Sequence, residues 1–403
     1  MVEEMALTLS KKAQEVKPSS TLAITAKAKE MKANGINVVG FGAGEPDFNT
    51  PENVCEAAIK AIQSGFTKYT PASGTNELKQ AICDKFKTFN HITYNPNQIV
   101  ISNGGKHALS NAFDAILNPG DEVIIPAPYW LSYPEMVKLS DGVPVVIHGP
   151  KEQGYKVTAE QIEAAITDKT KAFILNTPSN PTGMVYNEAE LRAIAEVIVK
   201  HDIYVVADEM YEYLIYGDEK HVSIASFNEE IYKRCITCSG LSKSYAMTGW
   251  RIGYTASTVE IAKLMGAIQS HATSNPNSIA QKAAYEALTG QQDTVIKMRD
   301  EFDKRRKYMY DRICNMPYLS CVEPKGAFYV FVDVRDVWDK TYKGEKVGDT
   351  TRLASILIED YAVAIVPCDD FGFADHMRLS YAISMEEITQ GLDQIEAFLK
   401  ELV

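Results

Sequence analysis

The most informative stretch of the chain is residues 239–253, which read SGLSKSYAMTGWRIG. Lys243 follows an apolar run, lies between two serines and precedes Arg251 by eight positions. A free lysine amine has a pKa of about 10.4 and is a poor nucleophile unless its surroundings lower that value. Small neighbours and a nearby arginine are typical of a lysine that forms a Schiff base beside an anion-binding group. The alternative is a solvated surface lysine, and the other segments decide between the two.

Around this stretch the chain predicts an α/β fold, because short strands and helices alternate at the spacing of βαβ units in a largely parallel sheet. The predicted strands are residues 99–101, 122–125, 143–147, 171–175, 203–207 and 235–238. The helices between them include residues 107–117, 159–165 and 188–200.

A second, α+β domain is expected because 403 residues exceed the roughly 250–300 at which one core stops growing. We predict a large domain over residues 50–290 and a smaller one from residues 1–49 and 291–403. The predicted elements of the smaller one are helices at 20–34, 292–315 and 385–402 and strands at 36–41, 327–332, 363–366 and 377–381.

The composition limits the partners and the compartment. A net charge of −12 and a pI near 5.2 argue against a nucleic-acid partner, which would need a basic stripe. No run approaches the ~20 apolar residues of a membrane span, and the acidic start at 1–4 does not resemble a secretion signal. We therefore expect a soluble cytoplasmic protein without a membrane partner.

Seven scattered cysteines suit a reducing compartment better than a disulfide framework. Cys235 and Cys238 have the C-x-x-C spacing, but no second pair completes a zinc site and the residues between them favour a buried strand. We expect no metal.

Side chains with useful chemistry follow the strand ends, where open α/β sheets bind ligands. Gly104 and Gly105 come directly before a helix, which suits a phosphate cradle, although a structural turn is an equal explanation. Asn180 is flanked by prolines and would present a rigid amide, with a simple turn as the alternative.

Asp208 ends the strand at 203–207, and Tyr211 follows three residues later. A carboxylate beside a pyridine nitrogen keeps that nitrogen protonated and makes the ring a better electron acceptor. Tyr211 could then hydrogen-bond a phenolic oxygen of the same ring. A strand-end aspartate also often serves only as a cap, so this segment alone does not decide the function.

The remaining parts of such a site are a phosphate clamp, an aromatic face and a second arginine. Ser242 and the guanidinium fork of Arg251 suit a phosphate dianion, and Trp130 could stack on a planar ring. Arg378, in an apolar strand, needs either an internal ion pair or a substrate carboxylate. Together with Lys243 these residues fit a pyridoxal-phosphate site.

Five segments, in this order, resemble the class I aminotransferases of PLP fold type I, whose large domain holds a mostly parallel, seven-stranded sheet. They are residues 42–48, 180–183, 208–211, 242–243 and 377–380. Residues 18–24 and 132–136 are similar to the bacterial class Ib aspartate aminotransferases, and the resemblance covers about residues 10–400. A glycine pattern at 40–44 looks like a dinucleotide fingerprint, but Glu45-Pro46-Asp47 follows where that motif needs a helix.

The resemblance implies pyridoxal 5'-phosphate as the cofactor and Lys243 as the catalytic lysine that forms the Schiff base with it. It implies that Asp208 pairs with the pyridine nitrogen, that Asn180 and Tyr211 hold the phenolic oxygen, and that Trp130 stacks on the ring.

By the same resemblance, the phosphate is held by Gly104, Gly105, Lys106, Ser242 and Arg251. The substrate is bound by Gly44, Trp130, Asn180 and Arg378, the last receiving the α-carboxylate. Tyr69 reaches the phosphate of the neighbouring subunit in this family, which implies a homodimer.

The expected activity is transamination of L-aspartate and 2-oxoglutarate to oxaloacetate and L-glutamate. Prephenate or aromatic substrates, or another reaction of the fold such as a β-lyase, are the alternatives. The group that reads the distal carboxylate is not evident, because no arginine occurs between Arg251 and Arg299 and position 114 is an aspartate. Lys17 is the best candidate, with a solvated lysine as the other explanation.

Overall fold

The computed structural model describes residues 8–18 and 20–403. The acidic start at 1–4 and Ser19 of the 18–24 segment lie outside the described residues. Within those described, no helix has the length and apolar character to cross a membrane.

The largest element is a seven-stranded sheet in which six strands run parallel and β8 runs antiparallel to both of its neighbours. In spatial order its strands are β2 (Ile99–Ser102), β8 (Gly253–Ala256), β7 (Cys235–Gly240), β6 (Tyr204–Asp208), β5 (Thr170–Asn176), β3 (Glu122–Ala127) and β4 (Val143–His148). The predicted mostly parallel sheet is confirmed. Sequence reasoning missed β8, because its four residues begin with a glycine and contain a single β-branched side chain, Thr255.

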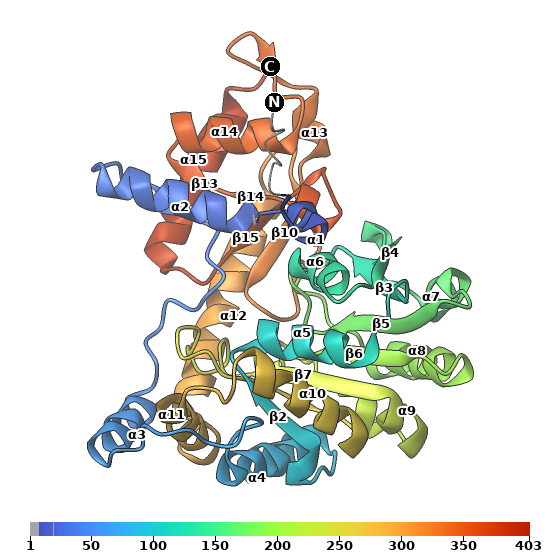
Figure 1. Ribbon diagram of the computed structural model, residues 1–403. Coiled ribbons are helices and arrows are strands. Elements are labelled where there is room, and N and C mark those ends of the chain that lie inside the picture. Colours follow the sequence, from blue (N-terminus) through green and yellow to red (C-terminus); the bar gives the residue numbers. More distant parts are fainter. Residues whose placement is uncertain (1–7, 19) are drawn as a thin grey trace, which may run out of the picture.

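Helices cover both faces of this sheet (Figure 1), so its strands are buried on both sides except for the edge strand β4, which is partly exposed. One face packs against α5 (Gly105–Ile116), α6 (Ser132–Leu139) and α10 (Val259–Ala272). The other packs against α3 (Glu52–Gln63), α4 (Asn76–Lys85), α7 (Ala159–Ala165), α8 (Glu188–Lys200), α9 (Glu229–Arg234) and α11 (Ser278–Thr289). Capping boxes at Thr158 and Asn187 fix the starts of α7 and α8.

A second apolar core forms around a smaller antiparallel sheet, which lies above the large sheet in Figure 1. Its strand order is β14 (Val366–Pro367), β15 (His376–Ser380), β10 (Tyr329–Asp333) and β9 (Ser320–Cys321). The surrounding helices are α12 (Asp293–Cys314), α13 (Arg335–Trp338), α14 (Thr350–Asp360) and α15 (Met385–Lys400). A hairpin of β11 (Thr341–Tyr342) and β12 (Glu345–Lys346) completes this part.

The N-terminal segment joins this second core. It contains α1 (Lys11–Glu15) and α2 (Ser20–Ala33), and β1 (Val39–Gly40) pairs in parallel with β13 (Val363–Ala364). The predicted strand at 36–41 is therefore reduced to two residues. The predicted strand at 363–366 divides into β13 and β14, which belong to different sheets.

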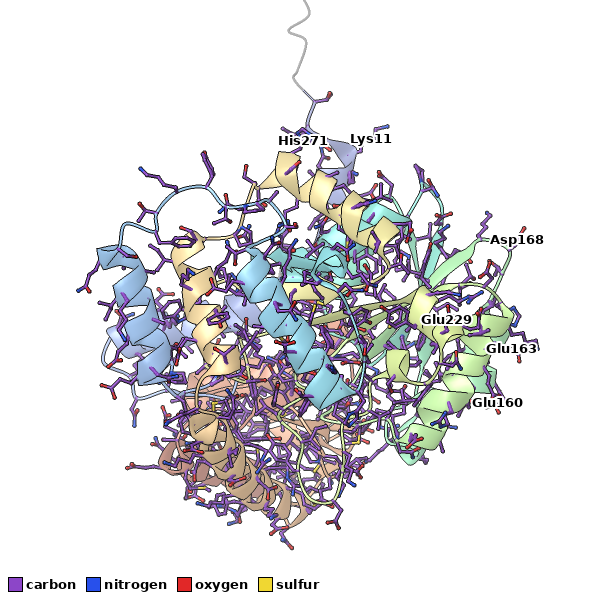
Figure 2. All side chains as sticks on the ribbon, turned by 90° about the horizontal axis from the view of Figure 1, so that it is seen from below. Lys11, Glu160, Glu163, Asp168, Glu229 and His271 are labelled. Atoms are coloured by element: carbon purple, nitrogen blue, oxygen red, sulfur yellow. The ribbon has the colours of Figure 1, made fainter. Side chains whose placement is uncertain are left out.

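Acidic side chains line one outer edge of the molecule. Figure 2 shows Glu160, Glu163, Asp168 and Glu229 pointing outward along the side formed by α7, α8 and α9. Glu163 is paired with Lys200 at 2.6 Å and Glu229 with Lys233 at 2.8 Å, so the acidic groups on this side are partly neutralised by neighbouring lysines.

β8 packs closely against the start of α5 at Gly253. A Cβ there would lie 2.4 Å from the amide nitrogen of Gly105 and 2.5 Å from the carbonyl carbon of Gly104. Gly253→Ala should therefore lower the free energy of unfolding by about 1–3 kcal/mol, measured by urea denaturation. Gly249→Ala is the control, because a Cβ there meets nothing within 4 Å. Equal stability of the two variants would contradict the packing.

Candidate active site

The carboxyl ends of β5, β6 and β7 meet at one edge of the large sheet. Asn176 at the end of β5 is in register with Asp208 at the end of β6, and Asp208 is in register with Cys238 of β7. The Asn176 side-chain amide donates a hydrogen bond to the carbonyl oxygen of Asp208 at 3.0 Å, and its Oδ1 accepts the amide of Asn180 at 2.9 Å. This edge therefore gathers Asp208, Asn180 and the segment that carries Lys243.

Asp208 is a buried carboxylate held from two sides. Its Oδ2 accepts a hydrogen bond from the Tyr133 hydroxyl at 2.6 Å, and its Oδ1 accepts the Met210 amide at 3.1 Å. Burial raises the pKa of Asp208 to about 6, against the downward effect of these two hydrogen bonds. No role was predicted for Tyr133 from the sequence, although it lies in the 132–136 segment that carried part of the resemblance.

Lys243 follows β7 and faces the N-terminal segment. Its ammonium group donates a hydrogen bond to the carbonyl oxygen of Gly44. Burial lowers the pKa of Lys243 to about 8; Arg378 and Arg251 act in the same direction, whereas Glu45 and Asp208 oppose them. At pH 7 roughly a tenth of this amine is therefore unprotonated and nucleophilic, far more than for a free lysine.

Arg378 of β15 is a buried guanidinium that forms no ion pair with the described residues. It is 2% exposed, and it donates to the side-chain oxygen of Asn180 at 3.0 Å and to the carbonyl of Gly42 at 3.4 Å. Its Nε has no hydrogen-bond partner within the described part of the chain. Burying a cation without a counter-charge is costly, so this arrangement favours binding of an anion. Of the two explanations for Arg378, the structure supports the carboxylate-binding one.

A cradle of glycines and cations lies at the start of α5. Gly104 has a φ of 88°, and the Arg251 guanidinium lies so close that a Cβ on Gly104 would be 2.3 Å from Nη2. The Lys106 ammonium lies 5.0 Å from the centre of the Trp130 ring. Burial, helped by Arg251, lowers the pKa of Lys106. Free helix amides and two cations together suit a phosphate group. The remaining predicted member, Ser242, is buried beside Lys243 in the chain.

Tyr211, which follows β6 of the large sheet, meets Tyr329 of β10 at the site, and both are part of the second apolar core. Their hydroxyl groups are 2.9 Å apart, and the Tyr329 ring lies under Arg378 with 4.4 Å between the ring centre and Cζ. Sequence reasoning missed Tyr329, because it was placed only as part of a predicted strand. Its position between Tyr211 and Arg378 orients both side chains.

Two predicted residues lie apart from this group. Tyr69 is 91% exposed, and Lys17 is exposed with its backbone amide 3.3 Å from Glu135 Oε2. In the described ranges, no hydrogen bond or ion pair joins either side chain to the residues around Lys243. Both were predicted to act from a partner subunit or a mobile segment, so a single chain does not test their roles.

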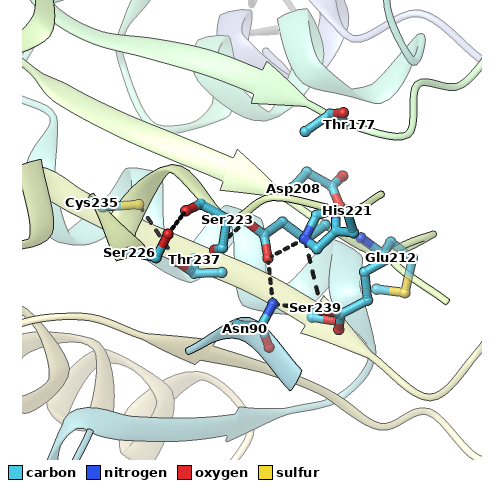
Figure 3. Close-up of polar contacts among 12 residues, drawn as sticks. Asn90, Thr177, Asp208, Glu212, His221, Ser223, Ser226, Cys235, Thr237 and Ser239 are labelled. Atoms are coloured by element: carbon cyan, nitrogen blue, oxygen red, sulfur yellow. Dashed lines mark hydrogen bonds and ion pairs between the residues drawn. The ribbon is translucent and has the colours of Figure 1, made fainter. Parts of the chain in front are cut away.

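A buried polar network lies behind Asp208 (Figure 3). Lys85 forms an ion pair with Glu212, and His221 Nε2 lies 2.9 Å from Glu209 Oε2. The Asn90 amide donates to both carboxylates, at 3.2 Å to Glu209 and 2.9 Å to Glu212. Further hydrogen bonds come from Ser223 to Glu209 and from Ser239 to Glu212.

Charge balance explains how this network can be buried. Burial opposes the charged forms, but Lys85 and His221 lower the pKa of Glu212 below its usual range. Burial alone would lower the pKa of His221. Glu209 and Glu212 outweigh this effect, so the pKa of His221 is raised. Glu209, Glu212 and His221 also have the donor set of a metal site, but two cationic side chains already supply the positive charge. The network fixes residues 208–212, the turn that presents Asp208 and Tyr211.

The spacing at Cys235 and Cys238 reflects a strand. Both thiols are buried on β7, and they belong to the apolar clusters on opposite faces of the large sheet. Alternation of side chains along a strand separates positions i and i+3 in this way. The prediction of a buried strand is confirmed.

Comparison with known proteins agrees with this geometry. The family model described as aminotransferase class I and II matches residues 36–395, so the chain belongs to that family. The solved structure of aspartate aminotransferase from Rhizobium meliloti is 41% identical with a TM-score of 0.95, covering 98% of this chain and 100% of that one. The structure of the Thermus thermophilus enzyme with maleate is 41% identical with a TM-score of 0.92, covering 97% and 100%. The predicted PLP fold type I is confirmed.

Two curated relatives indicate the range of named activities. Aspartate aminotransferase of Bacillus sp. (strain YM-2) is 50% identical over 97% of this chain and 99% of its own length. Aspartate/prephenate aminotransferase of Cereibacter sphaeroides is 48% identical over 95% of this chain and 96% of its own.

Lys85→Met tests the buried network. The substitution leaves Glu212 buried without its cation, so the free energy of unfolding in urea should fall by about 3–5 kcal/mol. Lys282→Met is the matched control, because Lys282 forms a more exposed ion pair with Glu77 and should cost less than about 1 kcal/mol. Similar losses in both variants would show that the network is not held by this pair.

Proposed function

We propose that this protein is an aspartate aminotransferase that uses pyridoxal 5'-phosphate to transfer the amino group of L-aspartate to 2-oxoglutarate. The observation that carries the proposal is the buried guanidinium of Arg378, which has no anionic contact within residues 8–18 and 20–403, near a lysine amine whose pKa is lowered to about 8. An anionic substrate would bind the guanidinium of Arg378, and a carbonyl group would react with the amine of Lys243. The names of the relatives support aspartate as the donor.

The residues at this edge fit the cofactor. Asp208 is a buried carboxylate whose position suits a pyridinium nitrogen, since such a partner would favour its ionised form. The cradle of Gly104, Gly105, Lys106, Ser242 and Arg251 suits the phosphate. Asn180 and Tyr211 would bind the phenolic oxygen, and Trp130 would pack against the ring. When bound, the cofactor supplies an electron-accepting ring that stabilises the charge left after an α-proton is removed.

Lys243 then serves as the acid–base group. In its unprotonated form the amine accepts the α-proton of the substrate. The ammonium group that results later donates a proton back. Arg378 binds the α-carboxylate, with Asn180 and Gly44 beside it, and so aligns the bond to the α-hydrogen. Tyr329 acts indirectly, because it supports the guanidinium of Arg378 from below.

The assembly is proposed to be a homodimer with composite sites. Tyr69, at 91% exposure, is free to reach a neighbouring subunit. Within each chain, residues 50–290 would form the large domain, and residues 1–49 and 291–403 the smaller one that brings Arg378 to the site. The cytoplasmic location stays a prediction.

The second candidate substrate is prephenate or an aromatic amino acid. It is favoured by the aspartate/prephenate relative and by a solved Thermus thermophilus tetra mutant complexed with tryptophan. Maleate, a dicarboxylate, occupies another structure of that enzyme. Aspartate is preferred because the curated relatives from Bacillus sp. (strain YM-2), Bacillus subtilis and Geobacillus stearothermophilus, at 47–50% identity, carry that activity alone in their names.

A steady-state scan of amino donors against 2-oxoglutarate tests the proposed activity. Aspartate should give the highest kcat/KM. Incubation with aspartate in the absence of 2-oxoglutarate should convert the bound cofactor to its pyridoxamine form. If the protein instead eliminates the β-substituent of β-chloroalanine but forms no glutamate with any donor, it is a β-lyase and the proposal fails.

Lys17→Ala tests the reading of the distal carboxylate. Loss of one ion pair should lower kcat/KM for aspartate at least about tenfold, while a neutral donor such as alanine is spared. Lys11→Ala is the control, because Lys11 is an exposed lysine on the same N-terminal segment. Equal losses for aspartate and alanine would remove Lys17 from substrate recognition.

The carboxyl group of Asp208 gives a pH-dependent prediction. Below its pKa of about 6 the group is protonated and cannot pair with a pyridinium, so the affinity for pyridoxal phosphate should fall as pH decreases through 6. Tyr133→Phe removes a hydrogen bond that lowers this pKa, so the midpoint should move upward. Fluorescence titration of cofactor binding from pH 5 to 8 measures it. Tyr129→Phe is the control, and a midpoint that is unchanged in Tyr133→Phe would contradict the role of Tyr133.

A further inference from the structure

Two cysteines approach each other at the edge of the smaller sheet, far from the residues around Lys243 in the chain. Cys314 is the last residue of α12, and Cys321 is the last residue of β9. Their Sγ atoms are 4.0 Å apart. A disulfide bond needs about 2.05 Å between the sulfurs, so a side-chain movement of roughly 2 Å would close it.

The two thiols differ in access. Cys314 is exposed and Cys321 is half-buried, so an oxidant from solvent meets Cys314 first. In the described part of the chain, none of the five other cysteines forms a hydrogen bond with a second thiol. Cys55, Cys238 and Cys368, for example, contact the backbone carbonyls of Thr50, Gly105 and Val366. Cys314 and Cys321 are therefore the thiols best placed to form a disulfide bond on oxidation.

We propose that Cys314 and Cys321 form an oxidisable dithiol, which hydrogen peroxide converts to an intramolecular disulfide. The Cys314 sulfur attacks the peroxide O–O bond, which breaks to give a sulfenic acid and one water. The Cys321 sulfur then attacks the sulfenic sulfur, the S–S bond forms and the S–O bond breaks. The released hydroxide takes the proton that Cys321 loses and becomes a second water. Two electrons pass from the two thiols to one peroxide molecule.

The surroundings of Cys321 keep its thiol protonated before oxidation, and one of the causes is removed by the first step. Burial raises the pKa of Cys321, and the neighbouring Cys314 sulfur raises it further, whereas Lys151 lowers it. Once Cys314 carries a neutral sulfenic group, its contribution as a like charge disappears. The Lys151 ammonium, 3.0 Å from Asp333 and hydrogen-bonded to the Ser320 hydroxyl, is fixed beside the strand that carries Cys321.

The bond would join two elements of the sheet that also carries Arg378. β9 pairs with β10, and β10 pairs with β15, which holds Arg378 opposite Phe331. The disulfide would tie the free edge of this sheet to the end of α12 by closing a loop of a few residues, without entering the site around Lys243.

The test oxidises the protein loaded with pyridoxal phosphate, using a small excess of hydrogen peroxide. Thiols are then alkylated under denaturing conditions and the peptides analysed by mass spectrometry. Two of the seven thiols should be lost. After digestion with chymotrypsin, which cleaves after Tyr318, the peptides holding Cys314 and Cys321 should be linked, two hydrogen masses lighter than their sum, and dithiothreitol should separate them.

Variants make the assignment specific. Cys314→Ser and Cys321→Ser should each abolish the link, whereas Cys55→Ser, the control at another partly exposed cysteine, should leave it unchanged. The proposal is overturned if Cys314 proceeds to the sulfinic acid while Cys321 stays a free thiol, if the link forms between two chains, or if all seven thiols survive.

Discussion

The charge balance around Lys243 is the constraint on which the site depends. Two arginines, the buried Arg378 and the exposed Arg251, act on its amine against two carboxylates, Glu45 and the buried Asp208. Burial is the main cause of the lowered pKa of Lys243, and the two arginines lower it further. Binding of an anionic cofactor and an anionic substrate would balance the charge of the arginines. The same surroundings therefore give both a reactive amine and affinity for the groups that the amine acts on.

The two sheets divide the work of building this arrangement. The parallel sheet brings Asp208 and Asn180 to one edge through strand register, and the network of Lys85, Glu209, Glu212 and His221 fixes the turn behind them. The antiparallel sheet delivers Arg378, which rests on the Tyr329 ring. The contact between the Tyr211 and Tyr329 hydroxyls joins the segment after β6 to β10, so the geometry of the site depends on how the two sheets are placed.

Much of this was predictable from local sequence. The strand ends at Asp208 and the glycines before α5 follow directly from short β-branched runs and turn residues, and the order of motifs indicated the family. β8 was missed because Gly253 serves packing rather than strand propensity. Tyr133 and Tyr329 were missed as partners because hydrogen bonds across 75 and 118 residues leave no local pattern. Pairing of His221 with Glu209 likewise depends on tertiary contacts, as does the approach of Cys314 to Cys321.

The most direct measurement of the central claim is chemical. The protein is incubated with pyridoxal phosphate, reduced with borohydride and digested, and the modified peptide is identified by mass spectrometry. The account predicts one stable phosphopyridoxyl adduct, located on Lys243. No adduct, or an adduct confined to other lysines, would contradict it.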